Sequence, residues 1–242
     1  MATHPLSLPF ADPAHVAADA LASRLATDTG VTRRDLLAEM THAYGSTSAD
    51  GRWSQRAAYD VLEAAQVLHL TSNHIPTRPI ERLRYLIDMT QSLPTQSARS
   101  ESQVTLQQFS TPAPIGFLAA QAIGVRPTDI VLEPSAGTGL LAVHAAHVGA
   151  GLILNEIDPW RSALLAHSLP SAGLTCHDGE ILDDLLDPAA VATRVLINPP
   201  FSRSLGRGVD RHAGLRHLRA AFRRLAPGGR CAVTPSASRR AS

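Results

Sequence analysis

Acidic and amide side chains follow four hydrophobic runs of the kind that form buried strands. Glu133 follows residues 130–132, Glu156 and Asp178 follow the next two runs, and Asn198 ends the fourth. In a parallel sheet the carboxyl ends of the strands meet at one edge, so we expect these side chains to gather there. Carboxylate and amide oxygens accept hydrogen bonds, and carboxylates attract cations. The sequence therefore predicts a site for a ligand with amino, hydroxyl or cationic groups.

A loop of small residues follows Glu133 and leads into an apolar helix that begins at Leu140. Its residues are Pro134, Ser135, Ala136, Gly137, Thr138 and Gly139. A strand, a glycine loop and a helix form the place where an α/β sheet receives a nucleotide-like ligand. The spacing Gly137-x-Gly139-x-x-Ala142, with Glu156 about 20 residues further on, also fits a dinucleotide fingerprint. The loop by itself leaves the choice of ligand open.

Glu133 separates the candidate ligands. A carboxylate next to a pyrophosphate cradle would repel the anion that a helix N-terminus attracts. A ligand with a cationic sulfonium and an ammonium group has the opposite preference, and S-adenosylmethionine is such a ligand. Glu156 would then accept hydrogen bonds from the ribose hydroxyls, and Asp178 from the adenine amino group. The three acids favour S-adenosylmethionine as the cofactor over a dinucleotide.

The fourth strand runs directly into Asn198, Pro199, Pro200 and Phe201. Methyl transfer to an exocyclic amine is difficult because the nitrogen lone pair is delocalised. The asparagine oxygen and a backbone carbonyl within the prolines can accept the two amino hydrogens and direct the lone pair toward the methyl group. The prolines hold the backbone rigid, and Phe201 can stack on a planar target such as a flipped base. We expect these four residues to be catalytic.

The chain divides into a helical first part and an alternating second part. Helices are predicted over residues 14–26, from the Thr32 cap to about 45, and over 53–70 and 79–92. We expect residues 1–95 to form a helical N-terminal module without catalytic spacing, 96–106 a linker, 107–234 the domain that carries the site, and 235–242 an irregular tail.

The second part predicts strands over 130–132, 151–155, 174–176, 195–198 and 230–234. One helix is expected before them, from a Thr111 cap to Gly124. Between the strands, helices are expected over 140–147, over a stretch that ends at about 168, and over 211–225. Strands and helices that alternate at this spacing form a parallel sheet with right-handed crossovers. The predicted fold class is α/β.

Residues 107–234 resemble the class I S-adenosylmethionine-dependent methyltransferases, whose Rossmann-like sheet is parallel. Within them, the chain is similar to the amino-methyltransferases with an (N/D)PP(Y/F/W) motif, in the motif order of the N6-adenine DNA methyltransferases. The resemblance implies that residues 108–112 close over the methionine moiety. The cofactor-binding residues expected are Thr111, Pro112, Glu133, Pro134, Ala136, Gly137, Thr138, Gly139, Glu156, Ile157, Asp178 and Asn198.

The helical part adds a narrower likeness. Residues 57–66 read Ala-Ala-Tyr-Asp-Val-Leu-Glu-Ala-Ala-Gln, and the arrangement is similar to the methyltransferase-like N-terminal region of bacterial strawberry-notch-type helicase proteins. A complete class I sheet continues beyond its fifth strand with an antiparallel hairpin. We therefore expect a sheet truncated after the fifth strand, in a truncated version or a fragment of a longer protein.

Charge is distributed unevenly. All 22 basic residues are arginine, and ten of them lie after position 200 with a single acid, which gives that region a charge of +9. A basic terminal region suggests contact with nucleic acid, DNA above all, and Arg203, Arg207 and Arg211 are the candidate contacts. A helicase-like region or another component of a larger system is a further expected partner.

Composition excludes several classes of protein. With 44% hydrophobic residues and no long apolar run, neither a membrane span nor a secretory signal is predicted, and a cytoplasmic protein is expected. Two cysteines, Cys176 and Cys231, form neither a disulfide framework nor a four-ligand zinc site, so no metal is expected.

Three functions remain open. The first is methylation of N6 of adenine, or less favourably N4 of cytosine, in DNA. The second is a noncatalytic module that binds S-adenosylmethionine or DNA within a larger system. The third is methylation of RNA or of a protein glutamine, because the Asn-Pro-Pro-aromatic motif also serves those acceptors.

Overall fold

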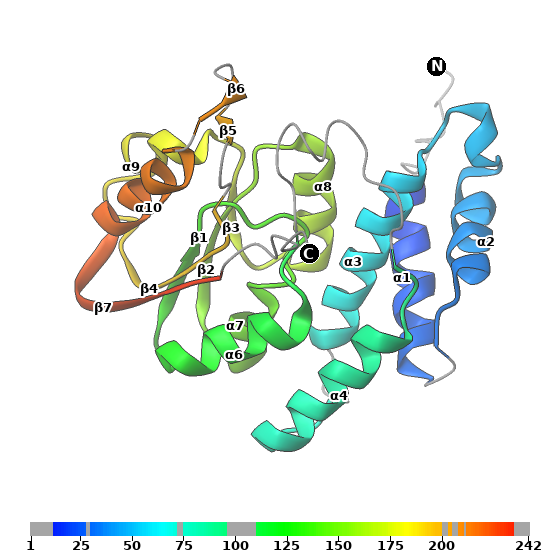
Figure 1. Cartoon of the computed structure of the whole chain (residues 1–242), viewed down its shortest axis with the longest axis horizontal. Helices are drawn as coiled ribbons and strands as arrows, with labels where there is room; N and C mark the ends of the chain where they lie inside the picture. The colour runs from blue at the N-terminus through cyan, green and yellow to red at the C-terminus, as the bar shows by residue number, and fades with distance from the viewer. Residues whose placement is uncertain are drawn as a thin grey trace, which may run out of the picture.

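A computed structural model describes residues 12–27, 30–71, 75–95, 110–199, 203–204, 208–210 and 212–234 (Figure 1). The helices are α1 (Pro13–Ala26), α2 (Arg33–Tyr44), α3 (Gln55–Thr71), α4 (Pro79–Ser92), α6 (Ala113–Ile123), α7 (Val143–Val148), α8 (Pro159–Ser168), α9 (Leu182–Leu185) and α10 (Ala213–Arg223), with short 3-10 turns η1 (Ser48–Asp50) and η2 (Gly179–Ile181). The strands are β1 (Ile130–Glu133), β2 (Gly151–Asn155), β3 (Gly173–Thr175), β4 (Ala192–Ile197), β5 (Arg203–Ser204), β6 (Gly208–Val209) and β7 (Leu225–Val233).

The four predicted N-terminal helices are present, and local signals explain their bounds. Thr32 and Asp35 form a capping box at the start of α2, and Gly45 ends that helix with a φ of 60°. Pro79 occupies the first turn of α4, where its missing N–H costs nothing. Helices α1, α2 and α3 share one apolar core.

Five strands form one sheet in the order β3-β2-β1-β4-β7, and every neighbouring pair is parallel. Successive side chains of a strand point to opposite faces of the sheet, so the apolar core is divided between the two faces. Leu132, Val195 and Ile197 pack in a cluster with residues of α9 and α10, whereas Val131 and Leu196 pack with residues of α6 and α7. The predicted α/β class, with helices before a parallel sheet, is confirmed.

Helix α3 joins the N-terminal helices to the sheet. It packs against α7 and α8 as well as against α1, and in Figure 1 it lies between α1 and the sheet. Val67 and Leu70 of α3 are buried in one cluster with Leu140 and Leu165. The loop after β1 is therefore bordered by this helix.

Several local predictions differ from the structure. Thr111 does not cap α6; Pro112 occupies that position without a side-chain hydrogen bond, because the Thr111 hydroxyl lies 3.3 Å from that of Thr234. Helix α7 begins at Val143 and not at Leu140, since the preceding residues complete the turn after the glycine loop.

The predicted arginine-rich loop after β4 contains a short antiparallel ribbon of β5 and β6, which projects at the top of Figure 1. The last strand of the sheet is also longer than expected, because β7 begins at Leu225 and pairs with β4 through a register shift between Ala192 and Arg194. Among the described residues, the helices are too short or too polar to span a lipid bilayer.

Candidate functional site

The carboxyl ends of β1, β2 and β3 are joined by the side chain of Asn155, which is buried at the end of β2. Its Nδ2 donates to the carbonyl oxygens of Pro134 at 3.0 Å and of His177 at 2.9 Å. Its Oδ1 accepts hydrogen bonds from Thr175 Oγ1 and from the His177 N–H, both at 2.9 Å. The amide is fully satisfied, so Asn155 holds the segments that follow three strands in one place.

Two glycines of the loop after β1 are required by its geometry. Gly137 and Gly139 have φ values of 59° and 98°, which side chains disfavour. A Cβ on Gly137 would stand 2.6 Å from Nη2 of Arg161, and one on Gly139 would stand 2.9 Å from Cδ1 of Leu165. The Ala136 N–H also donates to the carbonyl of residue 155 at 2.8 Å. The loop is therefore held tightly between β2 and α8.

The Glu133 carboxyl lies at the start of this loop and is 2% exposed. The Ala142 N–H donates to it, but its Oε2 has no hydrogen-bond partner among the described residues. Burial raises the pKa of Glu133 well above its usual range, and the negative charge of Glu156 adds to the rise. A buried carboxyl with a free oxygen suits a cationic ligand.

Glu156, the expected ribose acid, also holds the glycine loop. Its Oε2 accepts from the Gly137 N–H at 2.7 Å, and its Oε1 accepts from the Asp158 N–H at 2.9 Å. Each carboxylate oxygen keeps a second lone pair, which a ribose hydroxyl can use. Ile157, the next expected contact, is half-buried, and its carbonyl accepts from Cys176 Sγ at 3.5 Å.

Asp178, the expected adenine acid, is half-buried and caps η2 by accepting from the Glu180 N–H at 2.9 Å. The next residue touches the loop after β1: a Cβ on Gly179 would stand 3.1 Å from the carbonyl of Pro134 and 2.7 Å from Cδ2 of His217. The structure therefore brings the segments of all three acids to one edge of the sheet. The contact between Asp178 and adenine stays a prediction.

Asn198 follows β4 and lies beside the same loop. Ser135 Oγ donates to the Asn198 backbone carbonyl at 3.3 Å. The Asn198 side chain is half-buried and Pro199 is buried. Pro200 and Phe201 lie outside the described residues. The structure thus places the first half of the predicted catalytic motif next to the glycine loop.

The segment expected to cover the methionine moiety is described from Ser110 onward, so Gln108 and Phe109 lie outside the described residues. Thr111 is 6% exposed, and its hydroxyl lies near that of Thr234, just after β7. The carbonyl of Pro112 accepts the first backbone hydrogen bonds of α6. The segment therefore starts the helix that covers one face of the sheet.

A polar cluster between α3 and the glycine loop was missed by the sequence analysis. Glu63 Oε2 accepts from the hydroxyls of Ser110 at 2.6 Å and Thr138 at 2.7 Å. Arg161 Nη2 donates to Ser110 Oγ at 2.8 Å and lies 3.5 Å from Glu63, while its Nε lies 3.7 Å from Asp60. The only indication of this cluster in the sequence is that Asp60 and Glu63, three residues apart, share one side of a predicted helix.

Burial raises the pKa of Asp60 to about 7, and the charge of Glu63 adds to the rise. Arg161 and Arg56 oppose it, with Arg56 Nε 3.7 Å from the carboxylate, and Asp158 supports it. The Asp60 carboxyl is therefore protonated in the folded protein over a pH range in which it is ionised in the unfolded chain. Stability must fall as pH rises from about 4 toward 7, because the unfolded state binds fewer protons there.

The variant Asp60→Asn, which mimics the neutral carboxyl, is expected to flatten this pH dependence. At pH 8 it should be more stable than the parent by roughly 2 to 4 kcal/mol, as measured by urea unfolding between pH 4 and 8. Glu81→Gln, at the exposed ion pair with Arg78, is the control and should leave the profile unchanged. An Asp60→Asn protein with the parent's pH profile would contradict the assignment.

Three arginines in or directly after α10 make contacts within the protein. Arg216 Nε donates to Glu180 at 2.7 Å, and Arg223 Nη1 donates to Asp183 at 2.6 Å. Arg224, which follows α10, donates to the backbone carbonyl of Asp183 at 3.0 Å and to other carbonyls nearby. These three side chains hold α10 against the segment after β3, so three of the ten arginines after position 200 stabilise the fold.

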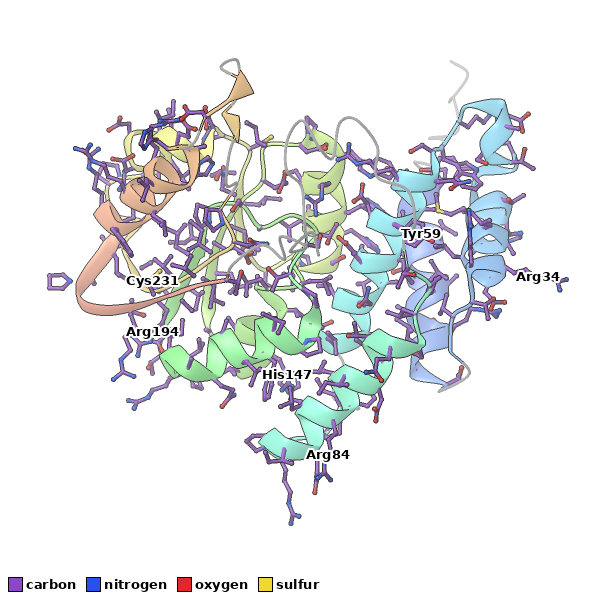
Figure 2. The ribbon with its side chains drawn as sticks, in the orientation of Figure 1. Arg34, Tyr59, Arg84, His147, Arg194 and Cys231 are labelled. Atoms are coloured by element: carbon purple, nitrogen blue, oxygen red, sulfur yellow. The ribbon has the colours of Figure 1, made fainter. Side chains whose placement is uncertain are left out.

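The expected phosphate contacts fall elsewhere. Arg203 begins β5, and Arg207 and Arg211 lie outside the described residues, so their contacts stay predictions. Figure 2 shows Arg34 of α2 and Arg84 of α4 with side chains that point away from the body of the protein, and both are exposed. Basic side chains therefore also reach solvent from the N-terminal helices.

Comparison with known proteins gives a likeness of fold. Neither a protein-family model nor a curated protein sequence matches the chain. A structure described as an RNA methyltransferase from Pyrococcus horikoshii is 24% identical, with a TM-score of 0.45, and the match covers 60% of this chain and 70% of that one.

Two further solved structures are similar to parts of the chain. A modification subunit ascribed to a type I restriction enzyme of Vibrio vulnificus is 18% identical over 88% of this chain and 50% of its own, with a TM-score of 0.47. A 16S rRNA N2 methyltransferase of Thermus thermophilus, in complex with AdoMet and guanosine, is 26% identical over 50% of this chain and 34% of its own, with a TM-score of 0.40. The chain thus spans half or less of these two proteins. The similarity does not identify the molecule that this chain would methylate.

Proposed function

We propose that this protein is an S-adenosylmethionine-dependent methyltransferase that acts on an exocyclic amino group, with N6 of adenine in DNA as the favoured acceptor. The observation that carries the proposal is the Glu133 carboxyl, buried at the start of the glycine loop with an oxygen that has no partner among the described residues. A buried acid of this kind is costly unless a cation meets it.

The residues around Glu133 fit this cofactor. The loop from Pro134 to Gly139 would lie against the cofactor, and Thr138 within it is 1% exposed. Glu156 would accept the ribose hydroxyls, Ile157 would lie under the nucleoside, and Asp178 would accept from the adenine amino group. S-adenosylmethionine supplies a methyl group activated by the positive sulfur.

Asn198 acts on the acceptor. Its side-chain oxygen and a neighbouring backbone carbonyl would accept the two hydrogens of the amino group and turn its lone pair toward the methyl group. Pro199 is buried and limits the motion of this segment. The charge that develops on the nitrogen makes its proton acidic, so a strong general base is not required. Phe201 would stack on the base.

Tritium transfer from labelled cofactor to duplex DNA, RNA and protein tests this function on the whole chain. We expect label on adenine in DNA. If Arg203, Arg207 and Arg211 each contact a phosphate, DNA binding should weaken roughly 40-fold between about 50 and 200 mM salt. Label in RNA or glutamine would reassign the acceptor. Cofactor binding without any transfer would favour a noncatalytic module and contradict the proposal.

A further inference from the structure

The amino-acid end of the proposed cofactor carries two opposite charges, an ammonium and a carboxylate. The acids at the strand ends suit its positive groups, but none of them can bind a carboxylate. A cation near the glycine loop would pair with this carboxylate, and a further acceptor there would bind the ammonium group. The assignment of residues to these two groups rests on the proposed function.

Arg161 brings a cation to the glycine loop. Its guanidinium lies against Gly137: from the position that a Cβ would take there, Nη2 is 2.6 Å away, Cζ 3.1 Å and Nη1 3.4 Å. The side chain comes from the first turn of α8 and is 5% exposed. Burial by itself would lower the pKa of Arg161, but Glu63, Glu156 and Asp60 raise it overall, so the group is charged.

The guanidinium keeps hydrogen-bonding capacity. Nη2 donates to Ser110 Oγ, but Nε is buried and has no hydrogen-bond partner among the described residues, since the Asp60 carboxylate stands 3.7 Å away. A guanidinium has five N–H donors, and a carboxylate is the group that its planar fork matches best. Arg161 is therefore suited to receive a carboxylate beside Gly137.

Glu63 supplies the acceptor from the other side. It stands on α3, and its Oε2 accepts hydroxyls from both sides of the site, Ser110 of the covering segment and Thr138 of the glycine loop. Its side chain is 25% exposed, so it is reachable. The covering segment, the glycine loop and the N-terminal helices meet at this carboxylate.

We propose that Arg161 binds the carboxylate and Glu63 the ammonium group of the cofactor's amino-acid end, which makes helix α3 of the N-terminal part a component of the cofactor site. The alternative is that the cluster only fastens α3 to the sheet. The two roles differ in their effect on affinity. A purely structural cluster changes the affinity for every ligand equally, whereas a subsite changes it only for ligands that have an amino-acid end.

Calorimetry with two neutral thioethers separates these roles. S-adenosylhomocysteine has the amino-acid end, and 5′-methylthioadenosine lacks it. Arg161→Met should raise the Kd of the first at least about tenfold and leave that of the second within about twofold. Glu63→Gln, nearly isosteric, should act in the same direction if Arg161→Met does not fold. Arg56→Met is the matched control, because Arg56 pairs with Asp60 and Asp158 in the same cluster, and it should weaken both ligands equally or not at all.

The outcomes also separate this inference from the proposed function. Equal losses for both thioethers in Arg161→Met and Glu63→Gln, or no loss at all, would overturn the subsite. A parent protein that binds methylthioadenosine at least as well as S-adenosylhomocysteine would overturn it too, while leaving the nucleoside site in place. A parent that binds neither thioether nor S-adenosylmethionine would remove the proposed function itself.

Discussion

Replacing Asn198 by alanine is expected to slow methyl transfer by at least about 100-fold, the usual effect of removing one positioned polar group that acts in the transition state. Cofactor affinity should change little, because the other cofactor residues stay in place. The fold should be kept as well, since the contact with Ser135 uses the Asn198 backbone carbonyl and not the side chain. Single-turnover tritium transfer measures the rate, and calorimetry measures the affinity.

Asn198→Asp is the control for this variant, because the resembled family accepts either residue at this position. An aspartate retains an oxygen acceptor for the amino hydrogens, so this variant should keep more activity than Asn198→Ala. If the alanine variant transfers methyl groups as fast as the parent, the catalytic assignment of Asn198 is falsified.

Replacing Glu133 by glutamine is expected to change stability and affinity in opposite directions. Without ligand, the variant should melt roughly 3 to 6 °C higher at pH 8, from about 1 to 2 kcal/mol of relieved burial. Affinity for S-adenosylmethionine should fall at least about tenfold, because a neutral amide attracts the sulfonium and ammonium charges less. Thermal melts and calorimetry on the same preparation measure both.

The pH dependence of this effect follows from the raised pKa of Glu133. Below about pH 4 the carboxyl is protonated in both states, and it contributes no penalty. As pH rises toward its folded pKa, the unfolded state releases the proton first, so the parent loses stability and the glutamine variant does not. A variant that melts like the parent at every pH and binds the cofactor equally well would contradict this role.

The elements that sequence analysis predicted best have local causes. Pro79 in the first turn of α4 and Gly124 at the end of α6 mark helix ends through their own backbone preferences, and both bounds are confirmed. The strands that end at Glu133 and Asn155 were recognisable as short apolar runs before polar residues. The α/β class followed from their alternation with helices.

What the sequence could not show depends on partners far along the chain. Thr111 has the residue type of a helix cap, but its hydroxyl lies beside Thr234, and no local pattern indicates this. Asn155 appeared to be only the end of a strand, although its amide joins the segments after three strands. The roles of Pro200, Phe201, Arg207 and Arg211 stay predictions, because these residues lie outside the described ones.

The contact of α3 with the glycine loop has a consequence for the order in which the protein forms during synthesis. Glu63 leaves the ribosome well before its partners Ser110, Thr138 and Arg161. Until Arg161 is made, the Glu63 carboxylate lacks the guanidinium that it faces in the folded protein, so its burial against the sheet is disfavoured. The final docking of α3 is therefore a late, long-range step, which the N-terminal helices cannot complete without the sheet.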